Sequence, residues 1–258
     1  KRKISGLKGI DTRALTRHIR KNGTIPGVIT GELEQGMKFW KENSPAVIQP
    51  SKHWVYQASV AEEYMIPGDG PVLAVLDLGI KRNILRCLQK KGYCLHVFPA
   101  GTPAEEILDS KPLGLVLSNG PGDPGELPEI AENMSRLISR LPIVGVCMGN
   151  QIMAMAAGGE TYKLPFGHRG GNHPVRNRQT GKVTMTSQNH GYAVREASLQ
   201  GTGFSVLYDN LNDGTVEGMR HEKYNILTVQ YHPEAAPGPQ ENEEIFDVFE
   251  EMLKGSLR

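Results

Sequence analysis

From residue 71 onward, short apolar runs alternate with segments whose apolar residues recur at the spacing of an amphipathic helix. The apolar runs predict strands at 72–77, 93–98, 114–118 and 142–147. The segments between them predict helices near 81–91, 103–110, 127–140 and 149–157. Strands separated by helices are typical of right-handed crossovers, so we expect an α/β fold with a central, mostly parallel sheet flanked by helices.

Beyond residue 160 the apolar runs become shorter and turn residues become more frequent. The runs predict further strands at 173–176, 182–187, 204–208, 215–220 and 226–231. We expect them to extend or flank the sheet as antiparallel additions. A closing amphipathic helix is expected at 241–254, because Ile245, Phe249 and Leu253 follow one another in steps of four.

The first 21 residues carry eight Lys or Arg residues and one acidic residue. A transit peptide or a nucleic-acid-binding segment can have this composition. The local signals favour a short amphipathic helix with a solvated basic face. Asp11 is a good N-cap, Leu15 and Ile19 are four residues apart, and Asn22-Gly23 is a typical helix end.

A chain of 258 residues can form one large domain and part of another. Prolines and a change of composition between 43 and 70 indicate a linker. We therefore expect residues 1–66 to be the end of one domain plus this linker, and 67–258 to form a second domain. The net charge of +1 gives no broad attraction to nucleic acid or anionic membranes, and no apolar run reaches the ~18 residues of a membrane span.

Cys147 stands where the apolar strand 142–147 changes directly into a predicted helix, with Gly145 and Gly149 on either side. Such a turn places its middle residue on a tight corner. The N–H groups that begin the helix favour a thiolate and can also bind an oxyanion. Alone, the residue could equally be an inert cysteine at a strand end. The chain has only two other cysteines and no Cys-x-x-Cys motif, which fits a reducing compartment such as the cytoplasm.

A candidate base follows the apolar strand 226–231, in the sequence His232-Pro233-Glu234. In extended chain, residues two apart point to the same side, so Glu234 can orient one imidazole nitrogen while the other faces a thiol. Nucleophile, base and orienting group are the three parts of a catalytic triad.

The segment Asn119-Gly120-Pro121-Gly122-Asp123-Pro124 follows a third predicted buried strand. Because strand ends of a parallel sheet share one edge, we expect this loop beside Cys147, where its N–H groups can complete an oxyanion hole. The same residues would also form an ordinary turn.

These three segments resemble the class I (triad) glutamine amidotransferases. Other segments resemble the small-subunit family of carbamoyl-phosphate synthetases, and they lie at 9–13, 78–85, 166–174 and 187–192. The similarity extends over nearly the whole chain. It implies the fold of a class I glutamine amidotransferase, with residues 1–66 as a remnant of the small subunit's N-terminal domain.

The resemblance also implies a role for each residue. Cys147 would form a γ-glutamyl thioester, His232 would transfer the proton, and Glu234 would orient His232. The N–H groups of Met148 and Gly120 would hold the oxyanion. Five further residues would line the glutamine site: Gly122, Gln151, Asn189, Gly191 and Tyr192.

The implied partner is a large synthetase subunit, in a heterodimer or higher oligomer, which would combine the ammonia with bicarbonate. ATP and Mg²⁺ are expected on that subunit, and no cofactor or metal is expected on this chain. His168 and His173 lie five residues apart but lack neighbouring sequence ligands for a metal. Lys81-Arg82 lacks the remainder of a phosphate-binding loop.

Two departures from the family pattern change the expectations. Asn150 stands where the family usually has histidine, and asparagine keeps a hydrogen-bonding group without titrating near neutral pH. Most of the family's N-terminal region is missing, including a serine that contacts glutamine, so weaker glutamine affinity is expected. Two other functions stay open: a free-standing hydrolase of γ-glutamyl amides and a non-catalytic subunit.

Overall fold

The computed structural model describes residues 6–47, 54–253 and 255. They form two compact units, each with its own internal contacts. One contains the described residues up to 47 together with Pro165–Gly167, and the other contains the rest. The linker that we expect at 43–70 includes residues 48–53, which lie outside the described part. The domain boundary expected between 66 and 67 stays a prediction.

The described residues of the first unit form two helices, α1 (Thr12–Asn22) and α2 (Leu33–Val47). The predicted helix is confirmed, since the Asp11 side chain accepts a hydrogen bond from the N–H of Ala14 and caps α1. Gly23 ends it with a φ of 76°, a value that glycine adopts without strain. The sequence pattern did not predict α2.

The larger unit is built on one ten-stranded sheet, in the order β1-β3-β2-β4-β5-β10-β9-β8-β6-β7, as far as the described residues show. Its strands are β1 (Tyr64–Ile66), β2 (Val72–Asp77), β3 (Cys94–Pro99), β4 (Leu115–Leu117), β5 (Ile143–Val146), β6 (Thr161–Asn177), β7 (Val183–Val194), β8 (Phe204–Asn210), β9 (Val216–His221) and β10 (Ile226–Val229). The five strands from β3 to β10 in this order are parallel, and the others add antiparallel pairs. The expected α/β fold with a mostly parallel centre is confirmed.

Two details of the C-terminal half differ from the expectation. The strand expected at 226–231 was placed among the antiparallel additions, but the observed β10 lies parallel to β5 and is antiparallel only to β9. Pattern alone cannot distinguish these pairings, because an apolar run buried on both faces suits either. The strand expected at 173–176 is part of the much longer strand β6, which also contains the whole Gly-rich segment 166–174 and has register shifts.

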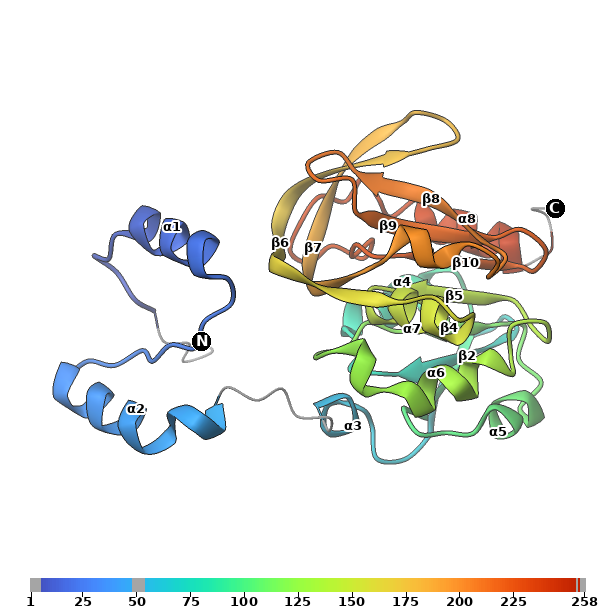
Figure 1. The fold of residues 1–258 in the computed structure, drawn as a ribbon. Coiled ribbons are helices and arrows are strands. Elements are labelled where there is room, and N and C mark those ends of the chain that lie inside the picture. Colours follow the sequence, from blue (N-terminus) through green and yellow to red (C-terminus); the bar gives the residue numbers. More distant parts are fainter. Residues whose placement is uncertain (1–5, 48–53, 254, 256–258) are drawn as a thin grey trace. The chain divides into compact units, whose positions relative to one another are not determined.

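Helices cover both faces of the parallel strands (Figure 1). One face carries α5 (Ala104–Asp109), α6 (Pro128–Ser135) and α7 (Met148–Ala156), and the other carries α4 (Arg82–Lys90) and α8 (Ile245–Leu253). The helix expected at 127–140 ends early, and turns follow it. The helix expected at 241–254 begins at Ile245, after a short run of turns.

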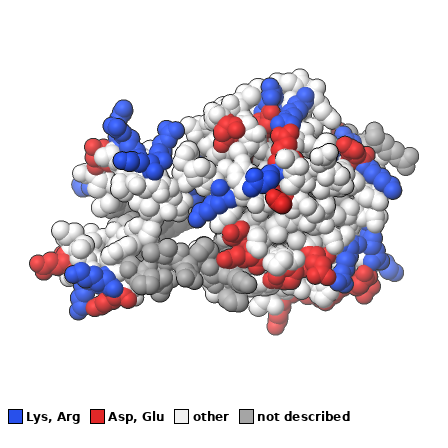
Figure 2. Space-filling model, viewed as in Figure 1, with Lys and Arg blue, Asp and Glu red and all other residues white. Residues whose placement is uncertain are grey.

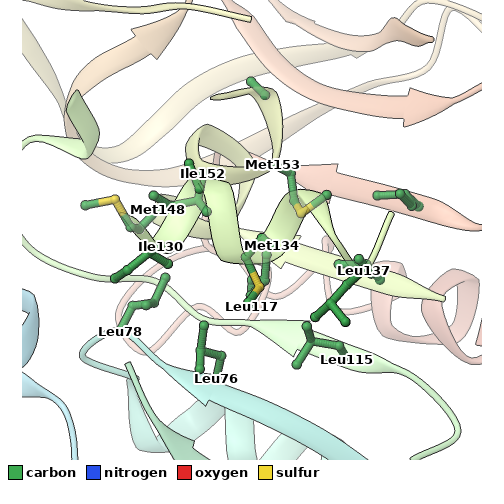
Figure 3. Packing of buried hydrophobic residues seen from close by; sticks show 14 of the residues in the cluster. Leu76, Leu78, Leu115, Leu117, Ile130, Met134, Leu137, Met148, Ile152 and Met153 are labelled. Carbon is green, nitrogen blue, oxygen red and sulfur yellow. The ribbon is translucent and has the colours of Figure 1, made fainter. Parts of the chain in front are cut away.

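The core over the first face consists of aliphatic side chains from the sheet packed against methionines and isoleucines of α6 and α7 (Figure 3). Leu76, Leu115 and Leu117 are fully buried and face Met134 of α6. Since each buried side chain of this size contributes about 1.5–3 kcal/mol, this packing holds the start of α7 firmly against β4.

Charged side chains of both signs occur on the face of the molecule shown in Figure 2. This mixture agrees with the net charge of +1. Among the helices that the structure describes, none has the length and apolar character needed to cross a membrane.

Candidate active site

Four loops that carry residues of the candidate site leave the same edge of the sheet. They follow β2, β4, β5 and β10, which are parallel and therefore end on one side. Contacts between the loops hold them together: the N–H of Lys81 donates to Asn119 Oδ1 at 2.9 Å, and the N–H of Gly149 donates to the Ser118 carbonyl at 3.1 Å. In an open α/β sheet this edge is the usual place for a ligand.

Cys147 occupies the one-residue turn between β5 and α7 and is 4% exposed. Its φ of 55° and ψ of −97° are strained for a residue with a side chain. The two neighbouring glycines make the turn possible. A Cβ on Gly149 would lie 2.4 Å from the Leu117 carbonyl oxygen, and one on Gly145 would lie 2.8 Å from the Gly149 backbone. The glycines therefore allow strand and helix to approach each other directly below the sulfur.

His232 lies beside Cys147 because β10 runs parallel to β5. Its Nδ1 is 2.8 Å from Glu234 Oε1, which leaves Nε2 for the sulfur. Burial lowers the pKa of His232, but the charge of the Cys147 sulfur, a hydrogen bond with that sulfur and the Glu234 carboxylate outweigh burial and raise this pKa to about 10. The imidazole is therefore protonated at neutral pH.

The sequence pattern predicted that Glu234 reaches His232 through extended chain. In the structure it does so through a turn. Residues 233 and 234 are in a turn, and the N–H of Ala235 donates to the His232 carbonyl at 3.2 Å. The carboxylate is fully buried. Burial raises its pKa, yet hydrogen bonds and charge from His232 and Lys81 lower it overall. Glu234 therefore stays ionised and holds His232 in its protonated form.

Lys81 and Asn83 also hold Glu234, and sequence reasoning missed both. Lys81 Nζ lies 2.7 Å from Glu234 Oε1, and Asn83 Nδ2 donates to the Glu234 carbonyl at 2.6 Å. In the sequence, Lys81 stands out only as part of an incomplete phosphate-binding loop. The signal that could have found it is its position directly after β2, at the edge of the sheet that carries Cys147.

The two predicted oxyanion donors come from different segments: Met148 begins α7 directly after Cys147, and Gly120 lies in the loop after β4. Three N–H groups of the first turn of α7 have acceptors. The N–H of Gly149 donates to the Ser118 carbonyl, and those of Asn150 and Gln151 donate to the Cys147 carbonyl. No acceptor is found among the described residues for the N–H of Met148. Gly120 lies close to the backbone of Leu78, so that a Cβ on Gly120 would be 2.4 Å from the Leu78 carbonyl oxygen. A glycine is therefore required at the place where its N–H is expected to act.

The predicted glutamine-site residues are only partly brought together. Gln151 Nε2 donates to the Tyr192 carbonyl at 2.8 Å. The Tyr192 hydroxyl forms a hydrogen bond with Asp123, which directly follows Gly122. Burial and this hydrogen bond raise the pKa of Tyr192 to about 12. Asn189 lies on the exposed face of β7, where it pairs in register with Arg169, and Gly191 lies near the same arginine.

One buried group of side chains has the composition of a metal site, within the part of the chain that is described. His168, His190 and Glu217 place ligand atoms within 4.8 Å of one another. Protein partners occupy most of these atoms. His168 Nε2 is 2.8 Å from Asp213 Oδ2, and both ring nitrogens of His190 face oxygen atoms within 2.9 Å. The group acts as a buried hydrogen-bonded network, and the expectation of no metal on this chain stays a prediction.

Comparison with known proteins identifies the family. A family model described as glutamine amidotransferase class-I matches residues 74–252, which include every segment of the site. The chain belongs to the class I glutamine amidotransferase family.

Two relatives of this amidotransferase show the same similarity along almost the whole chain. The carbamoyl phosphate synthase small chain of Listeria monocytogenes is 46% identical over 252 residues, which cover 98% of this chain and 69% of that protein. The protein of the same name from Bacillus cereus is 46% identical over 253 residues, covering 98% and 68%. Both confirm the resemblance found in the sequence.

A solved structure supports the fold alone. A protein described as a GMP synthase subunit, from Thermoplasma acidophilum, has a TM-score of 0.63 and 22% identity, covering 72% of this chain and 95% of that one. At this identity the likeness shows that the two proteins share the arrangement of the sheet and helices.

The amidotransferase has asparagine at 150, and its environment shows what this side chain does. Asn150 is fully buried. Its Oδ1 accepts from the Thr228 hydroxyl at 2.7 Å, and its Nδ2 donates to Gln230 Oε1 at 3.1 Å. Gln230 was not among the predicted site residues, because a glutamine at the end of an apolar strand gives no chemical signal in sequence.

Proposed function

We propose that this chain is the glutaminase component of a carbamoyl-phosphate synthetase. One observation carries the proposal: Cys147, His232 and Glu234 meet at one edge of the sheet in a chain that belongs to the class I glutamine amidotransferases. The relatives named as carbamoyl phosphate synthase small chains give the reaction to which the released ammonia belongs.

In the first half-reaction the Cys147 sulfur attacks the side-chain carbonyl carbon of glutamine. A C–S bond forms and the carbonyl oxygen becomes an oxyanion, which the N–H groups of Met148 and Gly120 stabilise. The imidazolium of His232 donates its proton to the amide nitrogen, so that the C–N bond breaks and ammonia leaves. The product on the protein is a γ-glutamyl thioester at Cys147.

In the second half-reaction a water molecule attacks the thioester while His232, now neutral, accepts its proton. The C–S bond breaks, the thiolate is restored and glutamate is released. Glu234 remains ionised throughout and stabilises the imidazolium each time it forms. The balance is glutamine plus water giving glutamate plus ammonia.

The remaining parts of the proposal concern substrate, partner and location. The glutamine site is lined by five residues: Gly122, Gln151, Asn189, Gly191 and Tyr192.

A large synthetase subunit, in a heterodimer or higher oligomer, receives the ammonia. It uses bicarbonate, ATP and Mg²⁺ to make carbamoyl phosphate for arginine and pyrimidine synthesis. The steps on this chain need only its own side chains and backbone. Its three free cysteines suit the cytoplasm.

The proposal is tested by Cys147→Ala in a complex with a large synthetase subunit. Glutamine-dependent synthesis of carbamoyl phosphate should be lost, whereas synthesis from added ammonia should continue. Equal loss of both activities would contradict the assigned division of labour. Glutamine hydrolysis by the unmodified chain, with and without the large subunit, supplies the second measurement. High hydrolysis that the subunit does not change would favour a free-standing hydrolase.

A further inference from the structure

We propose that Gln230 donates a hydrogen bond to the Cys147 thiolate, and that Asn150 and Thr228 hold its amide in the orientation required. The inference deepens the proposed function, and its consequence for turnover rests on that function. Neither Gln230 nor Thr228 was expected at the site, and no defined role for Asn150 followed from its type and position in the sequence.

The contact with the sulfur is direct. Gln230 Nε2 lies 3.6 Å from Cys147 Sγ, a separation suited to an N–H···S hydrogen bond. The Gln230 side chain is fully buried, and Cys147 is 4% exposed, so little water is available to solvate a thiolate here. The amide N–H therefore replaces a water that the buried sulfur lacks.

The orientation of the Gln230 amide follows from its other contacts. Its Oε1 accepts from Asn150 Nδ2 at 3.1 Å and from Gln151 Nε2 at 3.1 Å. With two donors at the oxygen, the amide nitrogen must point the other way, towards the sulfur. Asn150 is oriented in turn by the Thr228 hydroxyl, which donates to its Oδ1 at 2.7 Å. Asn150 is therefore a positioning residue that acts through Gln230.

The backbone fixes the same arrangement. Gln230 follows β10 directly, and its N–H donates to the Glu217 carbonyl of β9 at 2.8 Å. The N–H of Cys147 donates to the Val229 carbonyl at 2.8 Å. The parallel pairing of β5 and β10 thus places the side chain of Gln230 at the sulfur as well as bringing His232 there.

An amide donor does what His232 cannot do alone. His232 loses its proton to the departing ammonia, so it is neutral in the thioester intermediate and carries a proton again only after water has attacked. The Gln230 amide has no proton to lose at any pH near neutrality, and its N–H faces the sulfur through the whole cycle. It therefore stabilises the thiolate as nucleophile and again as leaving group.

The test measures the rate at which iodoacetamide alkylates Cys147 as a function of pH, followed by mass of the Cys147 peptide so that Cys87 and Cys94 do not interfere. Gln230→Met keeps the size of the side chain and removes the donor. It should move the acidic midpoint of the rate curve upward by about one unit, since a charge-assisted hydrogen bond is lost, and so slow alkylation about tenfold below the midpoint.

Three further variants separate this effect from a structural one. Asn150→Leu should move the midpoint in the same direction by less, because Gln151 still donates to Gln230, and it carries the test if Gln230→Met does not fold. Asn150→His replaces the amide donor with a ring N–H donor, so it should leave the midpoint of the alkylation curve unchanged. Gln188→Met removes another buried glutamine, one that contacts Glu217 and His190, and should lower stability without moving the midpoint.

An unchanged midpoint in folded Gln230→Met, or in Asn150→Leu, would overturn the inference, as would an equal shift in Gln188→Met. Alkylation needs neither glutamine nor a partner. If the unmodified chain failed to hydrolyse glutamine, the proposed function would fail while the alkylation curves still decided the role of Gln230.

Discussion

At the scale of single residues, the candidate nucleophile and its base lie side by side and are almost closed to water. Cys147 and His232 are 4% and 5% exposed. The imidazole keeps its proton because the sulfur on one side and the Glu234 carboxylate on the other both favour the charged form over the cost of burial. Lys81 contacts the same carboxylate oxygen of Glu234 as His232 does, and it keeps that carboxylate ionised. The protonated imidazole and the lysine thus both hold the buried carboxylate of Glu234 in its charged form.

Cys147→Ala should lower the pKa of His232 from about 10 towards its ordinary value of 6.5, because burial then opposes only the attraction of Glu234. Histidine NMR titration measures this change, with His232→Asn used to assign the signal. Glu234→Gln should also lower the pKa of His232, since it removes the negative charge of the Glu234 carboxylate. A His232 midpoint that stays the same in Cys147→Ala would show that the sulfur does not carry the charge that we infer.

At the scale of elements, the active-site turn depends on two short strands and one helix in direct backbone contact. The start of α7 lies against the end of β4, where the N–H of Gly149 donates to Ser118. Leucines of β2 and β4 fill the space below against α6 and α7 (Figure 3). This packing compensates for the strained backbone of Cys147, which would otherwise relax.

Gly149→Ala should destabilise the protein by about 1–3 kcal/mol, because its Cβ would be 2.4 Å from the Leu117 carbonyl oxygen, and a gain of roughly 1 kcal/mol in helix propensity offsets only part of the overpacking. Gly101→Ala is the matched control, since its Cβ would meet only Tyr56 at 3.6 Å, an ordinary contact. Urea unfolding measures both. Equal stabilities for the two variants would contradict the close approach of α7 and β4.

At the scale of the whole sheet, a buried polar network ties the antiparallel strands together beside the active site. His168 of β6 lies 2.8 Å from Asp213 and 3.4 Å from Glu217 of β9. Burial lowers the pKa of His168, but hydrogen bonds and charge from Glu217 and Asp213 raise it overall. The rings of His173 and His190, each 4.9 Å from that of His168, have lowered pKa values and stay neutral near pH 7.

This network predicts a pH dependence of stability. Because the pKa of His168 is raised on folding, its stabilising contribution is complete below about pH 6.5 and is lost as pH rises through the higher folded value. The free energy of unfolding should therefore fall as the pH rises above 6.5, and His168→Gln should remove this part of the fall. Denaturation at several pH values measures it. The same slope in the variant and the parent would show that His168 is not charged in the folded protein.

The sequence by itself determined the elements whose signals are local. The apolar run 72–77 matches β2, and Asp11 caps α1, because periodicity and capping depend on residues a few positions apart. The change from strand to helix at Cys147 was visible for the same reason. So were the motifs that indicated the family, since each is a short run with a fixed spacing.

The tertiary structure alone decided which distant residues meet. Strand 226–229 pairs in parallel with β5, and this pairing places both His232 and Gln230 at the sulfur. Nothing in the local pattern specifies it, because an apolar run buried on both faces is compatible with either direction. Lys81 likewise reaches Glu234 only because β2 and the parallel strands beyond it end at the same edge. Chemistry that depends on contacts across the sheet becomes visible only when strand order and direction are fixed.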